Sequence, residues 1–282
     1  MKHFEQVFAC FPAAIRQQIN AMDPYTRQHL QEIRVYKNRA VQVFADHKRI
    51  QLNGHIKEND INNILNNLMK FSYYAYEEDI AKGFITIDGG HRVGICGKAV
   101  VEKGKVTLLR DISSFNIRCA KEIIGCSDTL MHHVLTNHRI NNVLLVSPPN
   151  CGKTTMLRDL ARNLSLQDYK VAICDERSEI AGMHCGIPSY QFGPMLDVLD
   201  GCPKAEGMMM LVRSMSPDVI IADEFGRQED LKAIETCVHC GVAVITSAHG
   251  YHTGDVNTTH FDKVILLDNQ PCPGSIREVI DV

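Results

Sequence analysis

Five short runs of apolar residues, rich in β-branched side chains, constrain the fold of this chain more than any other feature. They are residues 143–146, 171–174, 219–222, 242–246 and 264–267, and a span long enough for a crossover helix separates each from the next. Continuous apolarity, rather than alternation of apolar and polar residues, is typical of strands that are buried on both faces. The pattern therefore predicts an α/β fold with a mostly parallel sheet.

The front of the chain lacks this alternation and mixes shorter elements. Apolar residues recur at helical spacing over residues 8–19 and 61–69, and Asn59 or Asp60 is placed to cap the second of these helices. Residues 84–97 are typical of a β-hairpin with turn-forming residues at its tip. These elements predict a small α+β unit.

The change of pattern marks a domain boundary near residue 125. A chain of 282 residues is long enough for about two domains. We therefore expect a small α+β N-terminal domain over residues 1–125 and an α/β domain over residues 126–282.

The composition excludes several classes of protein. The chain has 30 basic and 33 acidic residues, and a net charge of −3 argues against a chain-wide surface for nucleic acid. No apolar stretch reaches the roughly 18 residues of a transmembrane helix, and the first residues lack the features of a secretory signal. The 11 cysteines are scattered without a framework, which indicates reduced thiols. We expect a cytoplasmic protein that does not bind nucleic acid.

A phosphate-binding loop of the Walker A type follows the first buried strand. Gly152, Lys153 and Thr154 lie between that strand and a helix-compatible run, which is the context such a loop requires. Backbone N–H groups at the start of the helix would surround phosphate oxygens. Lys153 would reach the β- and γ-phosphates, and the Thr154 hydroxyl would ligate Mg²⁺. We expect the nucleotide to contact Ser147, Pro148, Pro149, Asn150, Cys151, Gly152, Lys153, Thr154 and Thr155.

The first position of this loop departs from the usual pattern, which has glycine there. Ser147 takes that place, and two prolines follow it. The departure weakens the motif slightly, although the prolines are placed to hold the turn.

The third apolar run ends in two acids and is typical of a Walker B strand. Asp223 is placed to contact Mg²⁺ directly or through water, and Glu224 to polarise the attacking water as a base. Solvated acids at the end of one strand are common. Both motifs in this order, however, predict a nucleoside triphosphatase with ATP and Mg²⁺ as cofactors.

Two further strand ends carry polar residues that would reach the same site. Asp175 and Glu176 follow the second strand, and His249 follows the fourth. Ligands of open α/β sheets bind at the carboxyl ends of the strands, so we expect these residues near the γ-phosphate. Glu176 competes with Glu224 for the role of base, and for His249 a sensing and a structural role are equally compatible with the sequence.

Metal and redox motifs elsewhere are weak. Cys237 and Cys240 form a single CxxC late in a helix-like span, where buried thiols are the better interpretation. His249, His252 and His260 lack the glutamate of a zinc-protease helix.

Several stretches outside the generic loop carry a more specific resemblance. They are residues 74–78, 83–86, 89–94, 114–118, 175–182, 197–210 and 213–218. On these stretches the chain resembles the stage III sporulation protein AA family of endospore-forming bacteria, which is related to the type II and type IV secretion ATPases. The resemblance covers nearly the whole chain.

This resemblance implies a RecA-like P-loop ATPase domain behind a smaller N-terminal domain, assembled into a hexameric ring. Its ATP hydrolysis would power a secretion-like transport apparatus between mother cell and forespore during sporulation. The protein would lie in the mother-cell cytoplasm, docked on membrane proteins of that apparatus. In related secretion ATPases, arginines of the small domain reach the γ-phosphate. Arg92 and Arg118 are the matching candidates, with Arg110 behind them.

Two other functions remain open. One is an ATP-binding scaffold that recruits membrane partners with little turnover, although such a scaffold does not need Glu224. The other is a P-loop small-molecule kinase, for which the sequence has no recognisable lid.

Overall fold

The computed structural model describes residues 2–46, 48–120, 122–184 and 186–282, with only the backbone described at residues 2–4 and 75. Contacts between residues divide the chain into two compact units. The first contains residues 1–121 and 184–189, and the second contains residues 122–183 and 190–282. Nothing in the sequence predicted that residues 184–189 group with the first unit.

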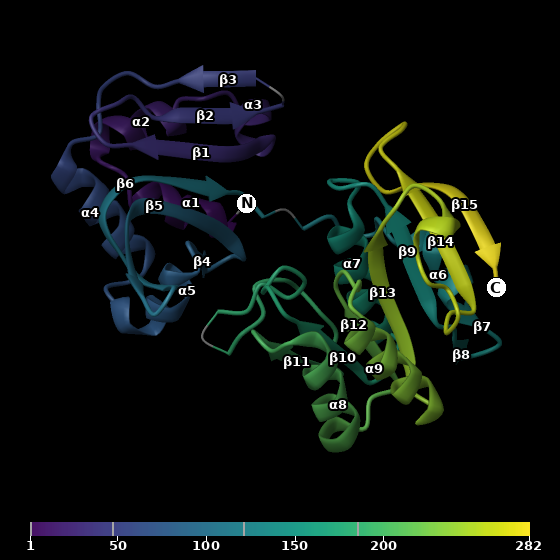
Figure 1. The fold of residues 1–282 in the computed structure, drawn as a ribbon. Coiled ribbons are helices and arrows are strands. Elements are labelled where there is room, and N and C mark those ends of the chain that lie inside the picture. Colours follow the sequence, from purple (N-terminus) through teal and green to yellow (C-terminus); the bar gives the residue numbers. More distant parts are fainter. Residues whose placement is uncertain (1, 47, 121, 185) are drawn as a thin grey trace. The chain divides into compact units, whose positions relative to one another are not determined.

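The first unit is built on a six-stranded sheet in the order β3-β2-β1-β6-β5-β4, with antiparallel pairing throughout (Figure 1). β4 and β5 form the hairpin that was predicted over residues 84–97, which confirms that expectation. The strands are β1 Leu30–Tyr36, β2 Gln42–Ala45, β3 Lys48–Gln51, β4 Phe84–Ile87, β5 His91–Glu102 and β6 Lys105–Arg118.

The helices of this unit differ from the sequence-based expectation at two points. The run over residues 8–19 is divided between two helices, because Pro12 precedes the second one and cannot continue the first. Asp60 does not cap its helix but lies in the first turn, where it accepts a hydrogen bond of 2.9 Å from the backbone N–H of Lys57. The helices are α1 Lys2–Ala9, α2 Ala13–Asn20, α3 Pro24–Gln28, α4 Glu58–Leu68 and α5 Glu77–Ala81, with a 3₁₀ turn η1 Tyr73–Tyr76.

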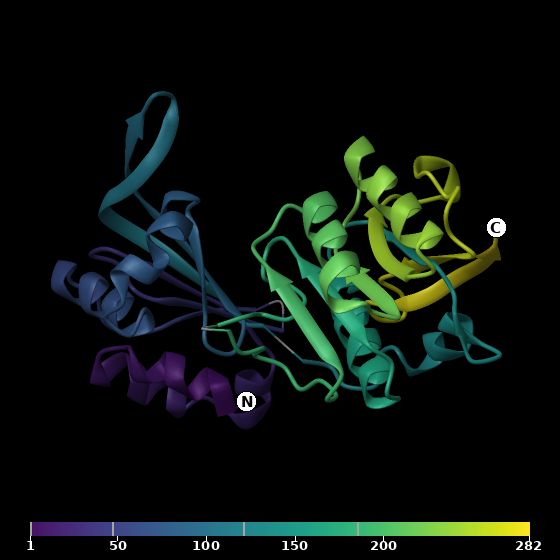
Figure 2. The same ribbon diagram turned by 90° about the horizontal axis from the view of Figure 1, so that it is seen from below.

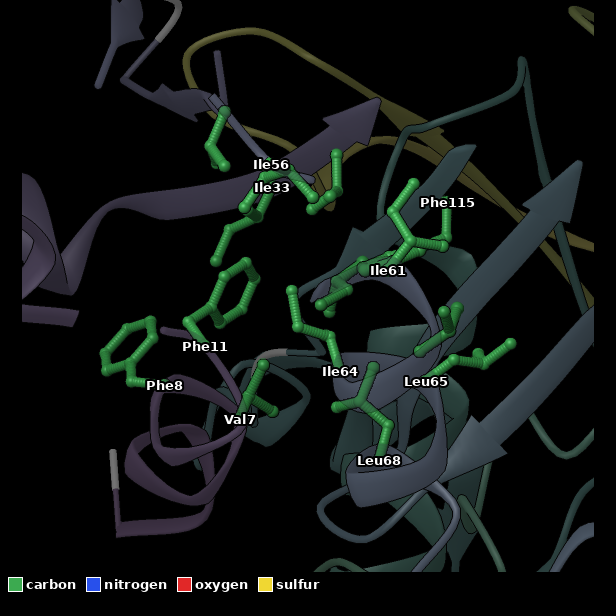
Figure 3. Packing of buried hydrophobic residues seen from close by; sticks show 14 of the residues in the cluster. Val7, Phe8, Phe11, Ile33, Ile56, Ile61, Ile64, Leu65, Leu68 and Phe115 are labelled. Carbon is green, nitrogen blue, oxygen red and sulfur yellow. The ribbon is translucent and has the colours of Figure 1, made fainter. Parts of the chain in front are cut away.

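The core of the first unit lies on one face of its sheet. Alternate strand residues are buried, as in Val93 and Ile95 of β5 and Phe115 and Ile117 of β6. Figure 3 shows side chains of α1 and of α4 in one cluster with Ile33 of β1 and Phe115 of β6. One buried face and one exposed face are typical of an antiparallel sheet.

The second unit contains a seven-stranded sheet in the order β11-β10-β12-β13-β9-β14-β15. All neighbouring strands are parallel except β14 and β15. The five predicted strands are all present, so the α/β fold with a mostly parallel sheet is confirmed. The strands are β9 Val143–Ser147, β10 Val171–Asp175, β11 Leu196–Asp200, β12 Val219–Ala222, β13 Ala243–His249, β14 Lys263–Asp268 and β15 Ser275–Asp281.

Helices cover both faces of this sheet (Figure 2). Successive residues of β9 enter different cores, since Leu145 packs with the helix after β9 and Leu144 packs with the two helices that follow. This arrangement explains why the strands are apolar without alternation. The elements are α7 Lys153–Leu166, α8 Lys204–Met215, α9 Gln228–His239, α6 Met131–Val134, η2 Asp128–Leu130, η3 Thr253–Asp255, β7 Leu135–Thr136 and β8 Arg139–Ile140.

The carboxyl ends of four parallel strands meet at one edge of the sheet. His249 of β13 pairs with Ser147 of β9, and Cys174 of β10 pairs with Ala222 of β12. The segments that follow these four strands carry the predicted site residues of the second unit. In the described part of the chain, no helix is long and apolar enough to cross a membrane.

Candidate nucleotide site

The loop between β9 and α7 has the backbone that a phosphate-binding turn needs. Asn150 and Gly152 have positive φ angles of 62° and 82°, in the left-handed region that glycine and asparagine tolerate best. Gly152 directly precedes α7, so the first N–H groups of that helix face the loop. Pro149 and Asn150 are exposed, whereas Cys151 is buried.

Ser147 is buried at the end of β9, where the usual motif has glycine. Its Oγ donates a hydrogen bond of 3.0 Å to the carbonyl oxygen of Pro148 and lies 3.2 Å from Lys153 Nζ. The hydroxyl of Ser147 therefore takes part in hydrogen bonds within the loop itself.

Lys153 is folded back onto the loop that it follows. Its Nζ lies 2.9 Å from the carbonyl oxygen of Ser147, 3.0 Å from that of Pro148 and 2.9 Å from Nδ1 of His249. Burial lowers the pKa of this amine, and the charge of Glu224 opposes that effect. The ammonium group thus rests on carbonyl oxygens that phosphate oxygens could replace.

His249 joins two of the predicted catalytic residues. Its Nδ1 faces Lys153, and its Nε2 lies 2.8 Å from Oε1 of Glu224. An ammonium group can only donate, so Nδ1 accepts and Nε2 carries the proton that is donated to the carboxylate. The structure therefore links Lys153, His249 and Glu224 in one chain of contacts.

The two acids after β12 have different surroundings. Asp223 is 8% exposed, and burial raises the pKa of its carboxyl while the ammonium group of Lys204 opposes the rise. Its backbone carbonyl accepts a hydrogen bond of 2.9 Å from Oγ1 of Thr246, which ties this turn to β13. The side chain of Glu224 is 39% exposed, as a residue that meets water must be.

Asp175 is buried, and its side chain forms hydrogen bonds within its own segment of the chain. Its carboxylate accepts hydrogen bonds of 2.8 to 3.0 Å from the backbone N–H groups of Glu179, Ile180 and Ala181. Burial raises the pKa of this carboxyl to about 6, although the backbone hydrogen bonds oppose the rise. Arg158 of α7 donates to the carbonyl oxygens of Glu179 and Ile180, so a buried acid and a buried base hold the same turn.

Glu176 follows Asp175 and remains available to solvent. Its side chain is 32% exposed, and Oε2 lies 4.0 Å from Nζ of Lys204. Glu176 and Glu224 both stay candidates for the base. Lys204 itself was not predicted, because a lysine at the start of a helix carries no pattern that points to a site.

The predicted Mg²⁺ ligands are of a suitable chemical type. The Thr154 hydroxyl and the Asp223 carboxylate supply oxygen, which Mg²⁺ prefers. No group of three or more His, Cys, Asp and Glu that could hold a metal ion is found among the described residues. Mg²⁺ in nucleotide sites is commonly held by one or two protein ligands and by phosphate oxygens, so the residues present fit this ion.

The candidate arginines lie in the first unit, apart from the unit that carries the loop. Arg92 and Arg118 are direct neighbours across β5 and β6. The guanidinium of Arg92 lies 3.7 Å from the centroid of the Phe84 ring, and Arg118 is exposed. Arg110 lies further along β6, opposite Lys98.

Comparison with known proteins gives the family. The family profile described as "Sporulation stage III, protein AA" matches residues 1–282. The chain belongs to this family. It is 40% identical over 291 aligned residues to the stage III sporulation protein AA of Bacillus subtilis strain 168, covering 98% of this chain and 94% of that protein.

Solved structures with a similar fold include an ATPase and a pilus retraction motor. The Yersinia pseudotuberculosis ATPase DotB matches with a TM-score of 0.59 and 14% identity, covering 91% of this chain and 76% of that one. The pilus retraction motor PilT with bound ADP matches with a TM-score of 0.57 and 14% identity, covering 84% and 74%. At this identity the likeness shows the fold alone. This chain therefore has a fold like that of PilT and DotB.

Proposed function

We propose that this chain is a Mg²⁺-dependent ATPase. The observation that carries the proposal is the chain of contacts from Lys153 through His249 to Glu224 at the carboxyl edge of the sheet. It brings a phosphate-binding lysine and a candidate base to the same place, with an exposed loop and a helix start beside them. The ATPase DotB has a similar fold, and PilT, which also has it, was solved with ADP bound.

Each residue has a defined task in this proposal. Amides at the start of α7 and the ammonium group of Lys153 bind the phosphates. Thr154 and Asp223 hold Mg²⁺, which neutralises charge on the β- and γ-phosphates when bound. Glu224 orients and polarises the attacking water, and Glu176 is the alternative base.

Nucleotide binding requires Lys153 to change partners. Its Nζ must exchange the carbonyl oxygens of Ser147 and Pro148 for phosphate oxygens. The contact of His249 Nδ1 with Lys153 is then lost, while its Nε2 proton still faces Glu224. We therefore expect His249 to report phosphate binding to the base.

The small domain supplies the remaining positive charge. Arg92 or Arg118, from a neighbouring subunit of a hexameric ring, stabilises the transferring phosphoryl group. The ring would power a secretion-like apparatus between mother cell and forespore. Its partners would be membrane proteins of that apparatus, on which it docks from the mother-cell cytoplasm.

Phosphate release from ATP tests the activity. We expect the parent protein to turn over ATP with Mg²⁺ and to stop when EDTA removes the metal. Lys153→Ala should lower kcat by at least about 10²-fold, and Glu224→Gln by about 10²- to 10⁴-fold. Glu176→Gln in the same assay decides which acid is the main base.

Lys232→Ala, on the exposed side of α9, is the control that keeps the parent rate. Parent-like rates in Lys153→Ala and Glu224→Gln would refute the assignment.

A scaffold that binds ATP and recruits membrane partners is the second candidate. The observation that favours it is the closed network of the loop, because Lys153 and Glu224 both already have partners. Tight binding of a fluorescent ATP analogue without phosphate release, in the presence of partners, would support this function over the motor.

A further inference from the structure

A buried lysine from outside the predicted motifs lies among the acids of the proposed ATPase site. Lys204 is the first residue of α8 and is 5% exposed. Its Nζ donates to the backbone carbonyl oxygen of Glu224 and lies 3.1 Å from Oδ1 of Asp223 and 4.0 Å from Oε2 of Glu176. We propose that Lys204 is a positioning residue for the reaction. It fixes the backbone from which Glu224 projects and balances the charge of Asp223 and Glu176. This inference rests on the proposed ATPase function.

Contacts with β10 fix the start of α8 in a position from which Lys204 reaches the acids of the site. The thiol of Cys174, at the end of β10, lies 3.6 Å from the carbonyl oxygen of Lys204 and donates to it. One turn later, a Cβ on Gly207 would lie 2.6 Å from the same sulfur, so only glycine lets the helix come this close. Met208 and Leu211 are buried in the core on this face of the sheet. The lysine therefore extends from a fixed point.

Lys204 supplies a cation where buried negative charge needs one. The Asp223 carboxylate is nearly buried, and an ionised carboxylate without a partner is strongly disfavoured there. Within the described residues, no other lysine or arginine nitrogen lies within 4.0 Å of this carboxylate. Without Lys204 the acid would have no close cation from a side chain of the described residues, and the carbonyl oxygen of Glu224 would lose its Lys204 donor.

Glu224 is consequently contacted at both ends, by His249 at its carboxylate and by Lys204 at its backbone carbonyl. Its carboxylate is contacted by His249, which contacts Lys153 of α7. Its backbone carbonyl is contacted by Lys204 of α8. Lys204 touches none of the loop residues that would bind phosphates in its described contacts, so its effect should fall on turnover and not on nucleotide binding.

The test is the steady-state kinetics of Lys204→Ala beside the control Lys232→Ala. We expect kcat of Lys204→Ala to fall by about 10²-fold, with KM for ATP within about threefold of the parent value. The control should keep both constants. A parent-like kcat in Lys204→Ala, or a rise in KM equal to the loss of kcat, would overturn the positioning role.

Chemical rescue separates positioning from structural support. Ethylammonium chloride supplies an N–H cation to the space left in Lys204→Ala, and we expect it to raise kcat at least about tenfold. Tetramethylammonium chloride at the same ionic strength has no N–H donor and should not. If the variant melts at a lower temperature and neither amine restores turnover, Lys204 is structural and the inference is wrong. An inactive parent protein would instead overturn the proposed function itself, and the role of Lys204 with it.

Discussion

His249 contacts Lys153 and Glu224 through different ring nitrogens. The sequence left a sensing role and a structural role equally open for this residue. Its position between the loop lysine and the candidate base favours sensing, because a nucleotide that engages Lys153 removes the contact between Lys153 and His249. A purely structural histidine would be buried among groups that do not change.

The buried carboxyl of Asp175 leads to a prediction about how the stability of the protein depends on pH. Burial raises its pKa to about 6, so the folded state binds a proton that the unfolded chain has already lost. Its contribution to the free energy of unfolding therefore falls as pH rises from about 4 to about 6, and is constant above. The difference between this pKa and the ordinary value of an aspartate corresponds to about 3 kcal/mol in the free energy of unfolding.

Urea unfolding of the parent protein and of Asp175→Asn at pH 4.5 and 6.5 measures this effect. The parent should lose more stability than the variant between these two pH values, because asparagine does not titrate. The same pH dependence in both proteins would contradict the prediction. At pH 6.5, where the carboxyl is mostly ionised, the variant should also be less stable than the parent, since an amide nitrogen would face backbone N–H groups that the carboxylate oxygens accept from.

Among the secondary-structure elements, the close packing of α8 against β10 depends on Gly207, which has no Cβ. Alanine is favoured over glycine in a helix by about 1 kcal/mol, but its Cβ would collide with Cys174 Sγ. Overpacking of this kind costs about 1–3 kcal/mol. We expect Gly207→Ala to lower the melting temperature and to lower kcat as well, because Lys204 starts the same helix.

The double variant Gly207→Ala with Cys174→Ala is the matched control. Removal of the sulfur makes room for the new methyl group, so part of the melting temperature and of kcat should return. If the double variant is no better than Gly207→Ala, close packing against Cys174 is not the cause of the loss.

At the scale of the whole molecule, the proposal requires more than one chain. Arg92 and Arg118 belong to a different unit from the loop. If they act in a ring, a chain lacking both arginines and a chain lacking Lys153 should complement each other. In a random mixture about a quarter of the sites would combine an intact loop with intact arginines from its neighbour.

Phosphate release by mixed variants tests this complementation between subunits. One variant is Arg92→Ala/Arg118→Ala, and the other is Lys153→Ala. Each variant alone should be nearly inactive, and the mixture should recover a clear fraction of the parent rate. Light scattering with and without ATP gives the mass of the assembly. A monomer under all conditions, or no recovery on mixing, would contradict arginines acting between subunits.

The parallel sheet and the candidate loop could be predicted from residue order alone, because both depend on patterns that are local in the chain. Five apolar runs predicted five of the seven strands in the larger sheet of the second unit. β11 and β15 were missed, since their half-buried and exposed residues lack the continuous apolarity of buried strands. Lys153, Asp223 and Glu224 could be predicted as site residues because each stands at a fixed offset from a strand end.

Only the tertiary structure decided which side chains meet at that edge. Lys204 lies far along the chain from Glu176 and contacts it only because α8 packs beside β10 and β12. Asp175 was predicted to flank the nucleotide, yet its carboxylate is bound by three amides of its own turn. Which partner a charged group takes depends on distances of a few ångströms between elements that are separate in sequence. Residue spacing therefore predicts where acids and bases lie, while packing decides which of them are paired and buried.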